Sequence, residues 1–173
     1  MTFRSRPRWW ASFAMCMTGL GCAATTPKPC TEPPPLRITL EAGERLNTDD
    51  RGRSLPTVVQ LLQVRSIRRL EGADFGAVNQ RPKEVFEEDL LRVDELTLEP
   101  GQTLTREFPR EPQAKQVVAV GLFRRPVGAG WRAPLLLDEV RPERCGPGGK
   151  GAGGEDARFR FQDGQVEPVQ ASR

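Results

Sequence analysis

The side chains that most often catalyse reactions or bind metals are scarce in this chain. Its 173 residues include no His and no Tyr, so the commonest general base near neutral pH and the commonest imidazole metal ligand are both missing. Catalytic triads and dyads that need His are therefore excluded. Chemistry based on paired carboxylates stays open, as does the chemistry of four cysteines, Cys16, Cys22, Cys30 and Cys145. We expect no enzymatic activity, no cofactor and no metal.

Three clusters of polar or aromatic residues could have either a functional or a structural role. Glu87, Glu88 and Asp89 are adjacent on a predicted helix, where they fan out instead of converging, so a solvated face is expected rather than an acid/base pair. The acids of the 47–50 segment lack the alternating spacing of a calcium-binding loop. Trp131-Arg132 has residue types enriched in interface hot spots, but we expect a Trp at the rim of the fold with the Arg stacked on it.

The first 21 residues are typical of a secretory signal peptide. Arg4, Arg6 and Arg8 precede an uncharged, largely apolar stretch from Trp9 to Leu20, which is the order of a basic region and a short hydrophobic region. Twelve helical residues rise only about 18 Å, less than the roughly 30 Å of a bilayer's hydrocarbon core. A permanent transmembrane helix is therefore the weaker interpretation.

The end of this segment, Gly19-Leu20-Gly21-Cys22, resembles a bacterial lipobox, in which the cysteine is acylated and becomes the first residue. The lipobox usually has Leu three places before the Cys, where this chain has Gly19. The alternative is an ordinary cleaved signal with a stray Cys. If Cys22 is lipidated, the next residue is Ala23 and not Asp, which by resemblance to the sorting rule of many Gram-negative bacteria favours the outer membrane. Buried acyl chains hold a protein firmly, since each methylene contributes about 0.8 kcal/mol.

Residues 22–35 follow as a lipidated Cys and a Pro-rich stalk, whose three consecutive prolines favour polyproline II. Cys30 and Cys145 form a candidate disulfide in an oxidising compartment, and two free thiols are the alternative.

Charge argues against a nucleic acid as partner. The chain's 26 Lys and Arg exceed its 23 Asp and Glu by three, and that excess equals the three arginines of the signal peptide. The remaining chain is close to neutral, whereas proteins that bind nucleic acids usually present a basic face.

Short strands with turns between them predict one domain over residues 36–170, an antiparallel β-sandwich with short helical segments. Period-two alternation or apolar runs predict strands at Leu36–Leu40, Thr57–Ser66, a hairpin from Val93 to Phe108, a central Gln116–Phe123, an edge Trp131–Leu137, and a last strand around Phe159 and Phe161.

Between the second strand and the hairpin, helical spacing returns. Leu70, Phe75 and Val78 are expected on one face of a short helix, and Pro82 is expected to start another that reaches Leu91. The segment 146–154 contains six glycines and is expected to be an irregular surface insertion, because the spacing of a phosphate-binding loop is absent.

Several short motifs, each unspecific alone, occur in an order that is more informative. They are Leu46-Asn47-Thr48-Asp49, Gly52-Arg53-Ser54-Leu55-Pro56, Val58 to Val64, Ala73-Asp74-Phe75, Asp89-Leu90-Leu91, Leu98-Glu99-Pro100-Gly101, Val117 to Arg124 and Trp131-Arg132. Behind a lipobox, this order over Leu36 to Leu137 resembles the TssJ family, the outer-membrane lipoprotein of the type VI secretion system.

The resemblance implies a transthyretin-like β-sandwich, an anchor in the outer membrane through acyl chains, and docking of the periplasmic C-terminal domain of the large inner-membrane subunit, TssM. It also implies that the loop after the first strand contacts this partner. The matching residues are Arg45, Leu46, Asn47, Thr48, Asp49, Asp50, Arg51, Gly52, Arg53 and Ser54. Two alternatives are an envelope enzyme such as a carboxylate-based glycan hydrolase, which needs two carboxyls in a cleft, and a ligand-carrying lipoprotein.

Overall fold

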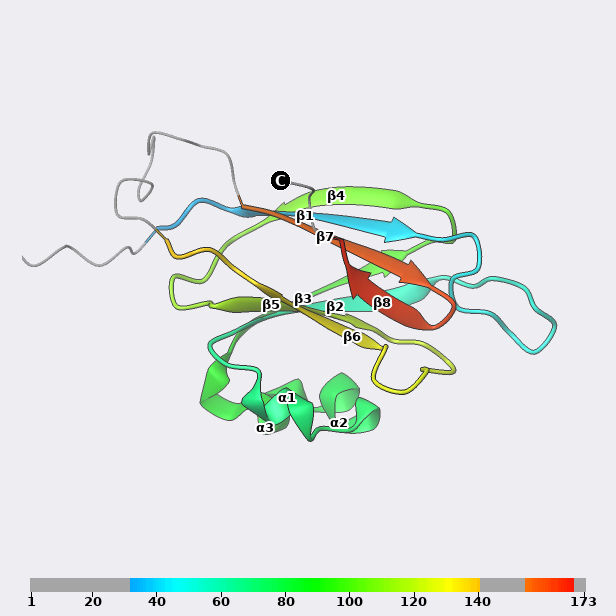
Figure 1. Ribbon diagram of the computed structural model, residues 1–173, viewed down its shortest axis with the longest axis horizontal. Helices are drawn as coiled ribbons and strands as arrows, with labels where there is room; N and C mark the ends of the chain where they lie inside the picture. The colour runs from blue at the N-terminus through cyan, green and yellow to red at the C-terminus, as the bar shows by residue number, and fades with distance from the viewer. Residues whose placement is uncertain (1–31, 141–154, 170–173) are drawn as a thin grey trace, which may run out of the picture.

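The computed structural model describes residues 32–140 and 155–169, which form two stacked β-sheets and a layer of short helices (Figure 1). One sheet has the order β4-β1-β7-β8 and the other the order β3-β2-β5-β6. The strands are β1 (Leu36–Ala42), β2 (Thr57–Val64), β3 (Leu90–Leu98), β4 (Thr103–Phe108), β5 (Gln116–Gly121), β6 (Arg132–Leu136), β7 (Glu155–Gln162) and β8 (Gln165–Pro168). The predicted mainly β sandwich is confirmed.

The β4-β1-β7-β8 sheet has one buried and one polar face. In β1 the apolar residues Leu36, Ile38 and Leu40 are almost completely buried, as period-two alternation requires. Phe159 and Phe161 of β7 are also buried, and the ring of Phe161 lies 6.4 Å from that of Phe123. Arg158 and Arg160, which alternate with these phenylalanines, are exposed, so the outer face of β7 carries charge.

The β3-β2-β5-β6 sheet is covered on both faces, which explains why β2 and β5 are the most apolar strands. Helices α1 (Arg68–Glu71), α2 (Phe75–Gln80) and α3 (Pro82–Phe86) and the 3-10 turn η1 (Glu87–Asp89) lie beneath it in Figure 1. Gln60 of β2 donates to the backbone oxygen of Asn79 in α2, at 3.3 Å. Gln63, also in β2, donates to the oxygen of Pro109 at 2.7 Å. Each of these two glutamines therefore donates to a backbone oxygen, although the Oε1 of Gln60 is buried and, within the described residues, has no hydrogen-bond partner.

The helical segment differs from its prediction in two places. The predicted single helix is two helices, because Asp74 caps α2 by accepting from the amide of Ala77 at 2.8 Å, and a side chain that bonds this amide starts a new helix. The second predicted helix ends at Phe86, since Glu87 has a positive φ of 50°. Leu90 and Leu91 consequently lie in β3 and not in a helix.

The sheet topology also corrects the prediction. Gly101 has the expected positive φ, 72°, but the turn does not close a hairpin, because β3 pairs with β2 and β4 pairs with β1 of the other sheet. A turn signal indicates that the chain reverses and not which sheet the next strand joins. In addition, β7 runs parallel to β1, and a further strand, β8, follows the Asp163-Gly164 turn.

Candidate functional site

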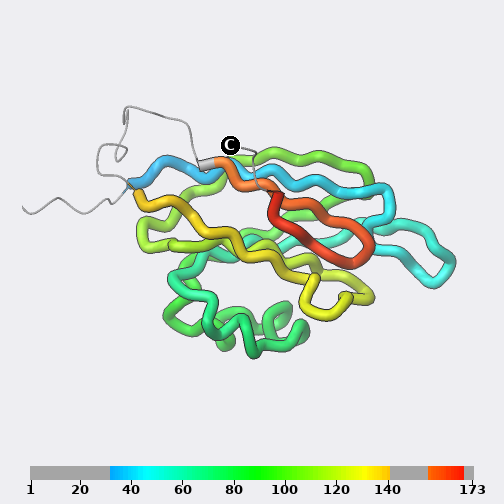
Figure 2. Tube along the Cα trace, in the orientation of Figure 1, coloured from blue at the N-terminus to red at the C-terminus, as the bar shows by residue number. Residues whose placement is uncertain are grey.

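The loop that the resemblance points to, residues 43–56, connects the two sheets at one end of the sandwich. It projects beyond the strands as the cyan segment in Figures 1 and 2. Three other connections share this end, namely the β3–β4 turn (residues 99–102), the β5–β6 loop (residues 122–131) and the β7–β8 turn (residues 163–164). We call the β1–β2 loop, the β5–β6 loop and the β7–β8 turn together the loop end.

The predicted contact residues divide into an anchor and a tip. Leu46 is completely buried and Asn47 is 6% exposed, so neither presents its side chain to a partner. Thr48 and Asp49 are half-buried, and residues 50–53 are exposed. Leu46 belongs to the hydrophobic core, so its side chain supports the loop, whereas Arg45 and residues 50–53 are exposed. That Arg45 to Ser54 contact a partner stays a prediction.

Asn47 fastens the base of the loop. Its Nδ2 donates to the oxygen of Pro56 at 3.2 Å, and its Oδ1 accepts from the amide of Arg124 at 2.9 Å. One side chain thus closes the β1–β2 loop on itself and joins it to the β5–β6 loop. An Asn is suited to this position because it both donates and accepts.

Asp49 shapes the tip. Its Oδ1 accepts from the amides of Arg51 and Arg53, each at 2.9 Å, and its Oδ2 accepts from the guanidinium of Arg53 at 2.8 Å. Hydrogen bonds that stabilise the charged carboxylate hold the pKa of Asp49 below its ordinary value, the amide of Arg53 contributing most and the Arg53 side chain next. Gly52 completes the turn with a φ of 75°, which glycine adopts without strain.

Ion pairs bind the loop to its two neighbours. Asp50 pairs with Arg125 of the β5–β6 loop, and Arg45 pairs with Asp163 of the β7–β8 turn at 3.0 Å. Ser54 donates to the backbone oxygen of Glu44 within the loop. These exposed pairs add little stability individually, but with the hydrogen bonds of Asn47 and Asp49 they tie the loop to its neighbours at several points.

The sequence did not indicate the β5–β6 loop as part of this surface. Its segment Arg124-Arg125-Pro126-Val127 shows only two cations before a turn. The structure brings it against the β1–β2 loop, and Val127 is 52% exposed. No periodic or compositional signal connects two loops that are about seventy residues apart.

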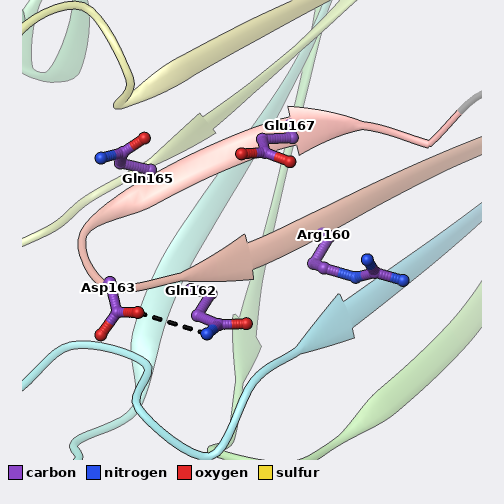
Figure 3. Close-up of a pocket in the computed structure, with 5 residues that line it drawn as sticks. All are labelled: Arg160, Gln162, Asp163, Gln165 and Glu167. Carbon is purple, nitrogen blue, oxygen red and sulfur yellow. Dashed lines mark hydrogen bonds between the residues drawn. The ribbon is translucent and has the colours of Figure 1, made fainter.

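A shallow polar hollow of about 290 Å³ lies beside the loop end, on the outer face of β7 and β8 (Figure 3). Its two carboxyls come from Asp163 and Glu167, but Asp163 already pairs with Arg45 and accepts from Gln162 at 3.2 Å. This hollow gives no support to a hydrolase in which two carboxyls act on one substrate. A wider groove of about 920 Å³ at the opposite end is open and lined by Leu91, Leu136, Leu137 and charged residues, unlike the enclosed cavity of a ligand carrier.

The remaining predicted clusters have structural explanations. Glu87 and Glu88 pair with Arg69 of α1 at 2.7 and 3.6 Å. Trp131 is 4% exposed, and Arg132 stacks on its ring at 4.8 Å, as predicted. Arg132 also donates to the oxygens of Leu70 and Ala73, and its burial lowers the pKa of its guanidinium. Trp131 and Arg132 therefore join the helical layer to the β3-β2-β5-β6 sheet.

Cys22, Cys30, Cys145 and the 146–154 segment lie outside the described residues, so lipidation and the disulfide stay predictions. Within residues 32–140 and 155–169, no three metal-binding side chains come together. In the same part of the chain, no helix has the length and hydropathy needed to cross a membrane.

Comparison with known proteins supports the fold and a family. The model of the type VI secretion lipoprotein family, described as VasD, EvfM and TssJ, matches residues 34–146. A search of curated proteins found no match.

Three solved structures are similar in fold. The T6SS lipoprotein TssJ1 from Pseudomonas aeruginosa has 20% identity and a TM-score of 0.61, over 81% of this chain and 99% of that chain. Serratia marcescens Lip, a membrane-bound component of the type VI secretion system, has 21% identity and a TM-score of 0.66, over 80% and 99%. A chain in a structure of the TssM C-terminal domain from EAEC has 21% identity and a TM-score of 0.61, over 80% and 99%. These likenesses confirm the transthyretin-like sandwich.

Proposed function

The chain belongs to the type VI secretion lipoprotein family, and from this premise we propose that it docks the C-terminal domain of a TssM-type inner-membrane subunit to the outer membrane. The similar chain in the structure of the TssM C-terminal domain supports this partner. The role is binding rather than catalysis, in keeping with a chain that has no His and no Tyr.

The observation that carries the proposal is the shape and bonding of the β1–β2 loop. A loop that projects from the sandwich and is braced by the hydrogen bonds of Asn47 and Asp49 and by two ion pairs is suited to a docking contact. Preorganisation reduces the entropy lost when a loop is immobilised by its partner. The exposed residues Asp50, Arg51 and Arg53 are the proposed contacts, with Leu46 and Asn47 as their support.

The anchor is proposed from the N-terminal sequence. Residues 1–21 act as the signal peptide, Cys22 carries the acyl chains, and the rest of the 22–35 segment spaces the 36–170 domain from the membrane. Ala23 after the lipidated Cys favours the outer membrane. Loss of acylation in a Cys22→Ser variant, measured by incorporation of a labelled fatty acid, tests the anchor independently of docking.

Docking is tested by co-purification of the full chain from detergent-solubilised membranes. Replacing the entire 45–54 loop would remove Leu46 from the core, so the informative change is the double variant Asp50→Ser, Arg51→Ser at the tip. Recovery of the TssM-type subunit with the wild type but not with this variant supports the proposal. The matched control is Arg106→Ser, an exposed position on β4. A wild-type chain that recovers no such subunit, in cells that produce it, contradicts the proposed function.

A further inference from the structure

The loop end holds two arginines without a carboxylate partner. Three of its acids are paired, Asp49 with Arg53, Asp50 with Arg125 and Asp163 with Arg45. The fourth, Glu44, lies at the base of the loop, where its carboxyl is against Gly101 of the β3–β4 turn. Within the described residues, Arg51 and Arg124 have no ion pair, and both are exposed.

The β5–β6 loop is fixed to the β1–β2 loop by more than one contact. The amide of Arg124 donates to Asn47, and Thr57 at the end of the β1–β2 loop donates to the oxygen of Leu122 at 3.1 Å. On its other side, the amide of Val166 donates to the oxygen of Gly130 at 2.6 Å. These hydrogen bonds place the β5–β6 loop beside the β1–β2 loop and tie it to the start of β8.

Val127 is the apolar element of this surface. It is 52% exposed, although it is held in a tight turn in which the amide of Gly130 donates to its oxygen at 2.8 Å. Its Cγ2 lies beside Gly164 of the β7–β8 turn. Single exposed apolar residues are common, but this one lies in a hydrogen-bonded turn at the same end of the sandwich as two cations that have no ion pair.

We propose that the docking face is composite: Arg124 and Val127 of the β5–β6 loop act together with Arg51 of the β1–β2 loop. The surface that fits it is an acidic segment of the partner with one apolar side chain that packs on Val127. This inference rests on the proposed docking function and adds the second loop and the chemistry of the partner surface. Two unmatched cations on a domain that is otherwise near neutral supply the charge complementarity that guides such an encounter.

The test measures binding kinetics between the full chain, purified in detergent, and the immobilised C-terminal domain of the TssM-type subunit from the same organism. Arg124→Glu is expected to slow association about tenfold and to weaken its dependence on salt. Val127→Ser is expected to raise the Kd roughly tenfold, mainly through faster dissociation. The matched controls are Arg106→Glu on β4 and Leu136→Ser, which is 72% exposed on β6, and both should bind like the wild type.

The outcomes separate this inference from the function on which it rests. If the wild type binds and Arg51→Glu weakens binding, while Arg124→Glu and Val127→Ser bind normally, the composite face is wrong and docking through the β1–β2 loop stands. If the control variants lose as much affinity as the loop variants, the chemistry proposed for the partner surface is also wrong. Absence of wild-type binding refutes the docking function itself. Because the altered side chains are exposed, unchanged circular dichroism spectra will show that each variant is folded.

Discussion

Asn47→Ala is the most direct test of how the loop end is built. Asn47 is 6% exposed and makes two hydrogen bonds, to the oxygen of Pro56 at 3.2 Å and from the amide of Arg124 at 2.9 Å. Each intramolecular hydrogen bond contributes about 1 kcal/mol net. Pro56 and Arg124 are exposed residues, and a larger cost applies only to groups that are left buried without a partner. We therefore expect the free energy of unfolding to fall by about 2 kcal/mol.

The assay is urea denaturation followed by circular dichroism, with Asn79→Ala as the matched control. Asn79 is half-buried in α2, and within the described residues its side chain has no hydrogen bond. Alanine at this helical position should leave stability unchanged or raise it slightly. A second measurement, hydrogen exchange of the Arg124 amide, should show faster exchange in Asn47→Ala alone.

An Asn47→Ala protein whose stability lies within about 0.5 kcal/mol of the wild type, with the Arg124 amide still protected, would show that the side chain does not join the two loops. The argument for a preorganised docking surface would then lose its main support.

Three further predictions concern the same framework. The pKa of Asp49 is lowered in the folded chain, first by the amide of Arg53. The carboxylate therefore stabilises the fold above its ordinary pKa near 3.8, and this contribution is lost as the pH falls below that value. Urea midpoints measured from pH 5 to pH 2 should fall less steeply for Asp49→Asn than for the wild type. Arg132→Met removes the stack on Trp131 and the hydrogen bonds to the helical layer, and should lower the free energy of unfolding measured by thermal denaturation by about 2 kcal/mol. Arg132→Lys should restore only part of this stability. An unchanged melting temperature for Arg132→Met would contradict the prediction. Gly164→Ala should lower the free energy of unfolding more than Gly52→Ala does. Both glycines have a φ near 75°, but only at Gly164 would the new Cβ lie 2.8 Å from the oxygen of Arg125. Equal losses of stability in the two variants would show that this close approach is relaxed easily.

Much of the fold follows from local patterns in the sequence. Alternation in Leu36–Leu40, the apolar runs of β2 and β5, and Gly101 at a turn each depend on residues that are neighbours in the chain, and each was located correctly. The Trp131-Arg132 stack was also predicted, because adjacent residues of these types interact within their own segment. The order of the short motifs added the family, which the match over residues 34–146 confirmed.

The sequence did not predict which distant segments pair with each other. The turn at Glu99 to Gln102 looks the same in the sequence whether it closes a hairpin or crosses between sheets, and only the tertiary structure shows that β4 pairs with β1. The parallel pairing of β7 with β1 likewise depends on strands more than a hundred residues apart.

The candidate site shows the same division. Residue types and resemblance located the 45–54 loop, but Leu46 and Asn47 could be separated from the tip only once the core around them was in place. Arg124 and Val127 became part of the surface through contacts between distant segments, such as the hydrogen bond from the Arg124 amide to Asn47, seventy-seven positions away, and the Asp50–Arg125 ion pair. Local sequence determined the strands and turns through short-range sterics and periodicity, whereas tertiary packing decided which side chains share a surface, because burial and pairing depend on the whole chain at once.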